Sequence, residues 1–309
     1  MDQFFVIAKI IAPIVMAIGL GILARRKNMM TPEEVRGLQQ FAIQFALPCV
    51  IFNACLSANI GTESLGSMGL ILILVVAATL GGFYARKKIF PYHNLPLLFS
   101  TQETGLLGIP LFMVLFGADQ VYHMGVLDLT QAVFFYITVA LLSSQTGESP
   151  SVLAIFKKVI TSPLLIVCAI ALTLNFSGIG AWLMEIGIGS ILTECTGFFA
   201  QTVSVMMIFS VGYNFSLSEN NRAAIFKISA VHFLVYAISG GLIQLALFLI
   251  PNVSSLTRWA VLMYTTLPPS YVAPSLGRTE EDFAVSSGVC SLLTIASLLV
   301  FCLIAAFSL

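Results

Sequence analysis

About ten long apolar stretches follow one another along this chain, each separated from the next by a short polar segment. A helix that crosses a bilayer needs about 20 mostly apolar residues, and these stretches use nearly all of the 309 residues. Only 9% of the residues are charged, against about 25% in an ordinary soluble domain. The sequence therefore predicts an all-α integral membrane protein. The expected helices cover residues 4–24, 37–58, 67–85, 94–116, 122–143, 159–175, 188–211, 223–250, 257–276 and 283–308.

Lysine and arginine collect in alternate connections between these stretches. Twelve basic residues fall on one side, whereas only Lys9 and Arg258 fall on the other. Because basic residues near helix ends are retained in the cytoplasm, the pattern predicts a multi-pass protein with both termini outside. We expect it to lie in a plasma membrane, namely a bacterial inner membrane. The twelve are Arg25, Arg26, Lys27, Arg36, Arg86, Lys87, Lys88, Lys157, Lys158, Arg222, Lys227 and Arg278.

Composition also argues against several classes of function. The net charge is zero, which excludes a basic surface for nucleic acid. The six cysteines lie inside apolar stretches without metal-ligand spacing, so they are interpreted as packing residues. We expect no metal and no cofactor. The expected partners are membrane lipid and a small molecule.

Ten helices divide into two sets of five, and two homologous halves with an odd number of helices lie in opposite orientations. The predicted halves are residues 1–143 and 159–309, joined by a cytoplasmic connector at residues 144–158. The fourth helix of each half carries glycine and proline that should interrupt it. These residues are Gly105, Gly108 and Pro110 in the first half and Pro268, Pro269 and Pro274 in the second.

Both interruptions lie roughly ten residues into their helices, or about 15 Å at about 1.5 Å per residue, which is near the bilayer midplane. Irregular backbone at that depth is tolerated only where it packs in protein or lines a wet cavity. A broken helix exposes free N–H donors and a partial positive charge that suit a carboxylate. Matched interruptions in two halves indicate a carrier for small organic anions. The alternative is that these prolines only kink packed helices.

Three short motifs support a family resemblance. The run Thr104-Gly105-Leu106-Leu107-Gly108-Ile109-Pro110, the segment Phe45-Ala46-Leu47-Pro48 and the segment Leu267-Pro268-Pro269 resemble the auxin efflux carrier family, which includes plant auxin carriers and bacterial permeases for malate or malonate. The resemblance extends over the whole chain.

The resemblance implies a fold related to that of the bile acid sodium symporters. In such a fold the broken fourth and ninth helices cross at the centre of a mobile transport domain made of helices 3–5 and 8–10. Helices 1, 2, 6 and 7 form a scaffold that often dimerises, so a homodimer is expected. Transport is then an elevator-type movement of one domain against the other.

The sequence departs from the family pattern at two places. The family commonly has asparagine before Thr-Gly in the fourth helix, where this chain has Glu103, and the seventh helix lacks the expected proline near Ser204 and Val205. An ionised glutamate accepts hydrogen bonds and repels a carboxylate. Glu103 is therefore expected to be protonated when an anion is bound, or to hold a cation.

Glu103 and Asp128 are the two acids deepest in the predicted helices. A charge near the bilayer centre costs at least about 2.5–3.5 kcal/mol, so such residues are functional candidates. We expect one or both to couple substrate movement to H⁺ or Na⁺. The alternatives are a structural carboxyl that binds freed backbone groups for Glu103, and a helix cap or an outer position for Asp128.

Neutral polar residues beside the interruptions are expected to bind the substrate, or else to form ordinary bonds between helices. Gln44 and Gln201 occupy the second helix of each half and are expected to face the substrate from the scaffold. The complete predicted binding set is Gln102, Thr104, Gly105, Gly108, Ile109, Pro110, Pro268, Pro269, Ser270, Gln44 and Gln201.

Three other functions fit parts of the sequence. A sodium-coupled symporter of the bile acid type shares the expected architecture. An intramembrane enzyme that uses Glu103 and Asp128 is a second possibility, although the sequence has no Gly-x-Gly-Asp, His-Glu-x-x-His or Gly-x-Ser-x-Gly motif. A channel is the third, and the matched interruptions favour a carrier over it.

Overall fold

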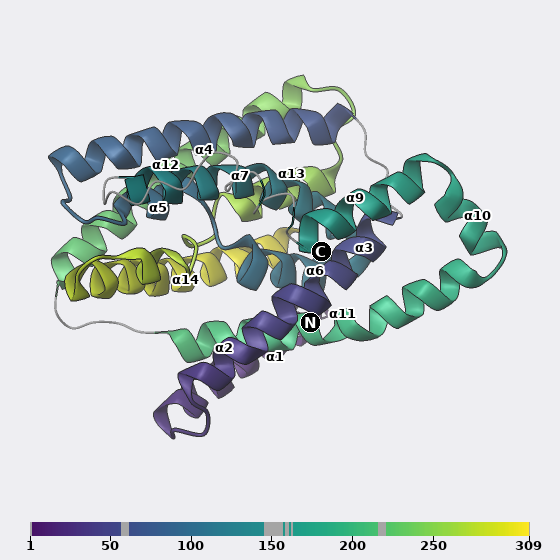
Figure 1. The fold of residues 1–309 in the computed structure, drawn as a ribbon, viewed down its shortest axis with the longest axis horizontal. Helices are drawn as coiled ribbons and strands as arrows, with labels where there is room; N and C mark the ends of the chain where they lie inside the picture. The colour runs from purple at the N-terminus through teal and green to yellow at the C-terminus, as the bar shows by residue number, and fades with distance from the viewer. Residues whose placement is uncertain are drawn as a thin grey trace.

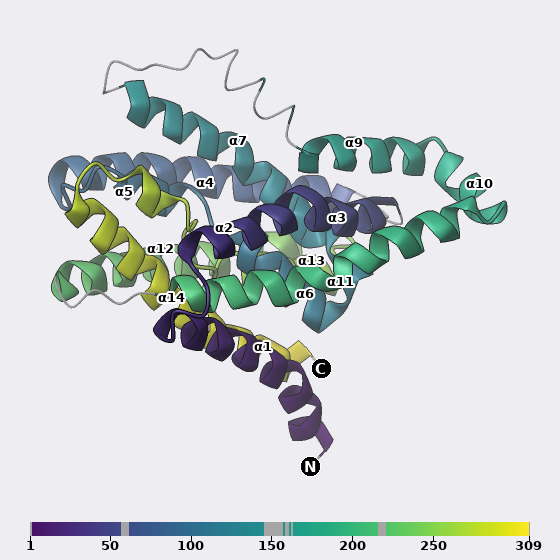
Figure 2. The ribbon, with the colours of Figure 1, turned by 60° about the horizontal axis from the view of Figure 1, so that its bottom comes forward.

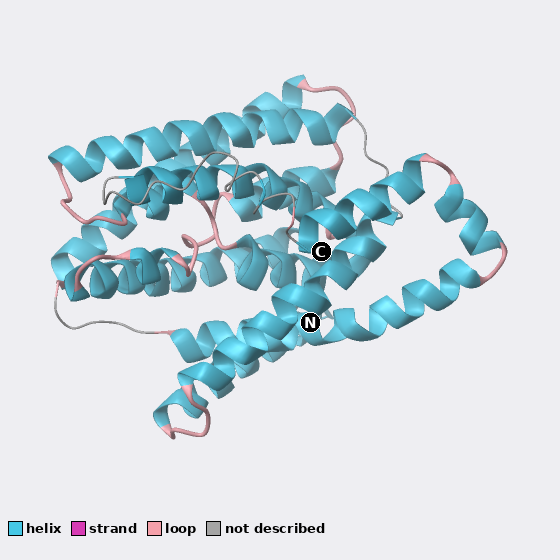
Figure 3. Cartoon of the chain, viewed as in Figure 1, coloured by secondary structure: helices cyan, strands magenta, loops and turns pink. Residues whose placement is uncertain are grey.

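The computed structural model describes residues 2–56, 62–144, 157, 161, 163–215 and 221–308. This part of the chain consists mainly of helices joined by short loops and contains no strand (Figure 3). The α-helices are α1 (Asp2–Arg26), α2 (Pro32–Phe41), α3 (Leu47–Leu56), α4 (Thr62–Lys88), α5 (Leu95–Ser100), α6 (Ile109–Phe116), α7 (Tyr122–Ser144), α9 (Pro163–Phe176), α10 (Ile179–Glu185), α11 (Ile188–Asn214), α12 (Arg222–Leu249), α13 (Ser255–Tyr264) and α14 (Glu280–Ser308).

Four shorter helical turns complete the chain. Two are π-helical, η1 (Ala42–Ala46) and η2 (Thr104–Gly108), and two are 3₁₀-helical, η3 (Ala118–Gln120) and η4 (Ala273–Leu276). Each π-helical turn ends two residues before a proline, at Pro48 and Pro110. A proline ring crowds the carbonyl of the preceding turn, and the wider π-helical turn relieves that crowding.

Seven helices of the described part are long and apolar enough to cross a membrane. Helices α9 and α10 are bent by 77° and, taken as one span, raise the number to eight. The two remaining apolar segments contain the broken elements, α5 with η2 and α6, and α13 with η4. Helices thus lie in each of the ten predicted segments, whereas the count of ten membrane crossings stays a prediction.

The helices lie in two groups side by side (Figures 1 and 2). One group contains α4, α5, α7, α12, α13 and α14, and the other contains α1, α2, α3, α9, α10 and α11. Helix α6 leaves the first group and packs against α11 of the second. The elements that follow the first interruption therefore lie between the two groups.

Small residues allow the closest helix contact of the second group. A Cβ atom at Gly21 of α1 would lie 2.6 Å from the backbone nitrogen of Tyr213 in α11. A Cβ atom at Gly212 would lie 2.8 Å from Cα of Ile18. Close backbone approach at glycine is the usual basis of helix association in lipid, where the hydrophobic effect between helices is absent.

Local signals in the sequence explain several helix ends. Thr31 and Glu34 form a capping box at the start of α2, with Thr31 Oγ1 accepting from the Glu34 N–H and Glu34 accepting from the Thr31 N–H. Helix α10, which was not predicted, is separated from its neighbours by Gly178 and Gly187, at φ 75° and 82°. Glycine adopts this left-handed conformation at little cost, so the chain turns sharply at both positions.

Candidate functional site

The two interruptions of the broken helices meet. The Glu103 N–H donates to the Pro268 carbonyl at 2.8 Å, and the Ser270 N–H donates to the Thr101 carbonyl at 3.2 Å. Gln102 and Pro269 form an isolated antiparallel bridge between these two bonds. Each interruption thus supplies partners for the backbone groups freed in the other, as a water-poor environment requires. The prediction that both stretches depart from regular α-helix and contact each other is confirmed.

The first interruption lies a few residues earlier than predicted. The backbone leaves helical geometry at residues 101–103, whereas Thr104–Phe116 forms one helix that begins with η2. Gly105, Gly108 and Pro110 therefore lie inside a helix, and their prediction as the break itself was wrong. The π-helical turn accommodates Pro110, because the Ile109 N–H reaches back five residues to the Thr104 carbonyl.

The second interruption also differs from the expectation. Helix α13 ends at Tyr264, and the chain returns to a helical turn only at η4, which contains Pro274. Pro268 and Pro269 lie at the centre of the irregular segment, as predicted. Pro274 was also predicted to interrupt the helix, but it lies inside the helical turn η4. A four-residue 3₁₀ turn replaces the second half-helix that was expected here.

Glycine at position 108 allows a close contact between the two interruptions. A Cβ atom there would lie 2.6 Å from Leu267 Cδ1. Leu267 itself is 3% exposed and has little room to move aside. Gly108, Ile109 and Pro110 thus pack inside the protein in this conformation. Their contact with a substrate stays a prediction.

The carboxylate of Glu103 joins both interruptions. Its Oε1 accepts from the Leu106 N–H at 3.1 Å, and its Oε2 accepts from the Tyr271 N–H at 2.7 Å. The first bond caps the helix Thr104–Phe116, where a negative charge is favourable. The Ser270 hydroxyl is a third partner. The arrangement matches the alternative of a carboxyl that binds freed backbone groups.

The amide of Gln102 spans the same contact. With its oxygen and nitrogen assigned by the hydrogen-bond network, the nitrogen donates to the carbonyls of Leu267 and Pro268 at 2.7 and 3.1 Å. The amide oxygen lies 3.0 Å from the Tyr236 hydroxyl. Gln102 is 2% exposed, so in this conformation its side chain holds the two broken helices together.

Gln131 of α7 connects the first interruption to its surroundings. Its Oε1 accepts from the Gln102 N–H at 2.7 Å and from the Tyr264 hydroxyl at 2.8 Å. Its Nε2 lies within 3.0 Å of the Gln102 carbonyl, Thr104 Oγ1 and Asp128 Oδ1. The Thr104 hydroxyl also donates to Asp128. Asp128 is therefore bonded to residues of the first interruption and of α7.

Sequence reasoning missed Gln131, Tyr264 and Tyr236. A signal for Gln131 was present, because it follows Asp128 by three residues and two polar residues at that spacing share one face of a helix. The two tyrosines carry no comparable signal in the sequence. Their hydroxyls lie in long apolar stretches, and only the tertiary structure brings them to the interruptions.

A comparison with known families identifies the chain. The profile of a family described as membrane transport protein matches residues 6–308, nearly the full length. The chain belongs to this family, the auxin efflux carriers. Membership indicates a membrane transporter rather than an enzyme and agrees with the apolar helices of a multi-pass membrane protein. A search of functionally described proteins found no significant match.

In this member of the family, hydrogen bonds also join the flanks of the two broken helices. The Asn94 amide before α5 donates to the Ala273 carbonyl at 2.8 Å and to Ser286 Oγ at 2.9 Å. The neighbouring His93 N–H donates to Asp282 Oδ1 at 2.8 Å. The loop before the first interruption and the segment after the second therefore form one unit.

His93 lies outside the helices, and its environment favours the neutral imidazole. Burial lowers the pKa of His93 below its ordinary value, and the guanidinium groups of Arg86 and Arg278 lower it further, against an opposing effect of Asp282. Nδ1 of His93 lies 2.9 Å from an Arg86 nitrogen. Because arginine can only donate, the imidazole accepts this bond.

Gln44 and Gln201, which were predicted to face the substrate from a scaffold, are not hydrogen-bonded to the interruptions in the described part of the chain. Gln44 is exposed on η1, and Gln201 is exposed on α11. Gln201 lines a cavity of about 540 Å³ between α3, α6, α10 and α11, together with Asn53, Asp119 and Thr193. This polar cavity lies between the helix that follows the first interruption and the second group of helices.

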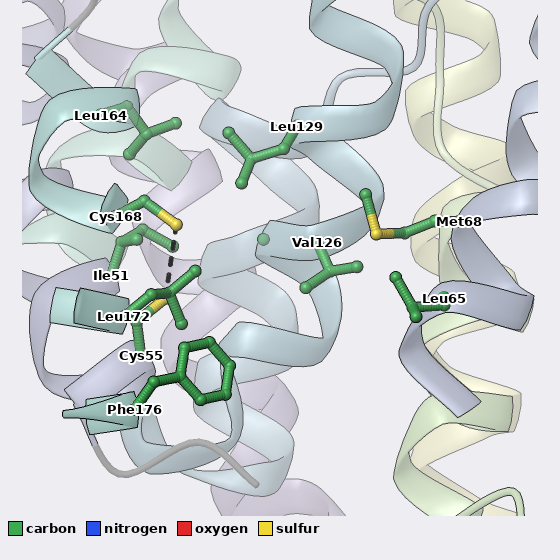
Figure 4. A pocket seen from close by; sticks show the side chains of 11 residues that line it. Ile51, Cys55, Leu65, Met68, Val126, Leu129, Leu164, Cys168, Leu172 and Phe176 are labelled. Atoms are coloured by element: carbon green, nitrogen blue, oxygen red, sulfur yellow. Dashed lines mark hydrogen bonds between the residues drawn. The ribbon is translucent and has the colours of Figure 1, made fainter. Parts of the chain in front are cut away.

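A second cavity, of about 600 Å³, is almost entirely apolar (Figure 4). It is bounded by α3, α4, α7 and α9, and the Cys55 and Cys168 sulfurs lie 3.7 Å apart in its wall. Its remaining lining is aliphatic or aromatic, apart from Met68 and Gly125. Since nothing there can hydrogen-bond a carboxylate strongly, this cavity does not suit the charged group of an organic anion.

Proposed function

We propose that this protein is a secondary transporter that carries small organic anions. The observation that carries the proposal is the contact of the two interruptions through Gln102 and Pro269. At this contact, main-chain donors, a helix N-terminus and two carboxyl groups lie close together. A site of this kind recognises a carboxylate without a basic side chain. Malate, malonate and auxin-like aromatic acids fit this description.

The proposal includes the complete architecture expected from the sequence. Ten spans form two inverted repeats, at residues 1–143 and 159–309, with a cytoplasmic connector at residues 144–158 and both termini outside. The helix group that contains α5 and α13 is the mobile domain, and the group that contains α1 and α11 is the scaffold. The mobile domain moves as an elevator against the scaffold, which also forms a homodimer in a bacterial inner membrane.

Glu103 and Asp128 are proposed to couple transport to H⁺ or Na⁺. Both belong to one hydrogen-bonded cluster, because Thr104 and Gln131 bind Asp128 while Glu103 caps the helix that Thr104 begins. Among the described residues bonded to the two interruptions there is no lysine or arginine. Two negative charges without a basic partner favour uptake of a cation or a proton.

Reconstitution in proteoliposomes tests this function. Vesicles preloaded with radiolabelled malate are diluted into buffer with or without external malate, and the series is repeated with malonate and indole-3-acetate. A carrier gives saturable flux and faster efflux when the same acid is outside. Flux that rises linearly with the acid concentration and does not change when external acid is added would indicate a channel. Repeating the assay in sodium and in potassium separates the two coupling ions and tests the sodium-symporter alternative.

A further inference from the structure

The carboxylate of Glu103 occupies donors that come from two segments distant in sequence. The Leu106 N–H belongs to the N-terminal turn of the helix after the first interruption, and the Tyr271 N–H belongs to the second interruption. Glu103 and Tyr271 are 168 residues apart in the chain. The two donors bind different oxygens of one carboxylate. The structure thus contains a built site for a carboxylate group, filled by a side chain of the protein itself.

A substrate carboxylate needs the same kind of partners. Anionic groups in the membrane interior can bind to main-chain N–H groups at helix N-termini when no basic residue is present. The described residues bonded to the interruptions offer main-chain N–H, amide and hydroxyl donors and no ammonium or guanidinium group. An organic anion and ionised Glu103 would therefore compete for Leu106 N–H and Tyr271 N–H.

We infer that Glu103 is an internal competitor of the substrate, and that an organic anion binds by replacing the Glu103 carboxylate at these two donors as Glu103 takes up a proton. This inference rests on the proposed transport of organic anions. It adds the two N–H groups that bind the anion and the number of protons taken up with each anion. The proton comes from solvent and binds to a Glu103 carboxyl oxygen. A neutral carboxyl is a weaker acceptor than a carboxylate, so it releases the two N–H groups to the incoming anion.

The geometry beside Glu103 leaves room for this exchange. Apart from its chain neighbours and the backbone of its own helix, the one described atom within 4 Å of a Cβ atom built at Gly105 is Glu103 Oε1, at 3.9 Å. Gly105, Ser270 and Tyr271 are half-buried, and the adjacent Val272 is 49% exposed. Partly exposed residues of both interruptions therefore lie next to the bonded carboxylate in the chain.

Charge repulsion explains why binding of an anion should favour protonation of Glu103. Asp128 lies in the same cluster and bears a second carboxyl. A substrate carboxylate bound beside ionised Glu103 and Asp128 would bring three charged carboxylates together, whereas protonation of Glu103 keeps the number at two. Other titratable groups around Glu103 and the interruptions are Tyr271, Cys290, Tyr264, Tyr236 and His232.

Proton-linked binding tests the inference on the purified full-length protein. Malate binding is measured by titration calorimetry at neutral pH in buffers of different ionisation enthalpy, which reports the protons exchanged. We expect uptake of about one proton per malate bound. Glu103→Gln should bind malate with no proton uptake and with an affinity that no longer falls as the pH rises. The matched control Glu185→Gln, an exposed acid of α10, should behave as the wild-type protein.

Each outcome has a defined meaning. Malate binding by the wild-type protein without proton uptake would overturn the inference, even if Glu103→Gln proved too unstable to purify. Proton uptake that persists in Glu103→Gln would also overturn it and would point to Asp128 or His232. If malate, malonate and indole-3-acetate neither bind nor are transported, the proposed function fails as well. Transport with no proton uptake would leave the proposed function intact.

Discussion

Glu103 Oε2 accepts a hydrogen bond of 2.7 Å from the main-chain N–H of Tyr271, and this bond connects the two broken helices of the carrier. The same carboxylate accepts from the Leu106 N–H through its other oxygen. One side chain therefore satisfies main-chain donors on both interruptions. Its removal should affect the structure of the site as well as ion coupling.

Replacing Glu103 with alanine should destabilise the protein. It leaves the buried Leu106 N–H and the half-buried Tyr271 N–H without their acceptor. The loss of a partner costs a fully buried group about 1–3 kcal/mol. We expect a clearly lower midpoint of thermal unfolding in detergent, with Glu103→Gln falling between alanine and wild type because its amide oxygen still accepts one bond. Glu185→Ala is the exposed control. Equal midpoints for Glu103→Ala and wild type would show that these bonds do not stabilise the fold.

A smaller side chain at Leu267 should compensate for a larger one at Gly108. Gly108→Ala places a methyl group 2.6 Å from Leu267 Cδ1, and overpacking of this kind costs about 1–3 kcal/mol. The variant should lose stability and transport, and Leu267→Ala in the same protein should restore part of both. Gly81→Ala, where nothing lies within 4 Å in the described structure, is the control. Additive losses in the double variant would contradict the contact.

Gln131→Ala should be among the most damaging single substitutions in α7. It removes the acceptor of the Gln102 N–H and the Tyr264 hydroxyl and the donor to Asp128. Several buried groups lose a partner at once, at about 1–3 kcal/mol each. Gln244→Ala, which removes one bond to the Arg258 carbonyl, should have a smaller effect on thermal stability. The reverse order would show that Gln131 does not organise the site.

The proximity of Cys55 and Cys168 predicts an internal cross-link. Their sulfurs are 3.7 Å apart across the contact of α3 with α9, so a small shift brings them to bonding distance. Treatment with copper phenanthroline should form a disulfide between these two residues, detected as a cross-linked peptide by mass spectrometry. Cys55→Ser should abolish that peptide. Failure to cross-link under conditions that oxidise the exposed Cys195 would argue against this helix contact.

The positions of the apolar helices could be predicted from the sequence, because a membrane-spanning helix needs a long apolar stretch. The contact of the two interruptions was expected only from the resemblance to the auxin efflux carrier family. The adjacent prolines Pro268 and Pro269 located the second interruption correctly. The first was misplaced at Gly105–Pro110, because a π-helical turn absorbs Pro110 while residues 101–103 pair with the other segment. The local sequence does not show whether residues 101–103 or residues 105–110 will form hydrogen bonds with the second interruption.

Roles of individual side chains were harder to predict for a similar reason. Gln102 was predicted to bind substrate, and the structure directs its amide to the carbonyls of the second interruption. Thr104 was placed in the same set, and its hydroxyl donates to Asp128. These contacts depend on which helices cross, and a single sequence contains no direct record of that. Whether these groups also touch a substrate stays a prediction.

Protection of a cysteine placed at the crossing tests the central claim most directly, namely that the substrate binds where the two interruptions meet. In Ser270→Cys, the rate of alkylation by N-ethylmaleimide is measured in proteoliposomes with and without a transported acid, and the exposed Cys195 is the internal control. The account predicts that every transported acid slows alkylation at position 270 in a saturable manner and leaves the rate at Cys195 unchanged. An acid that is transported and yet does not alter the rate at position 270 would contradict it.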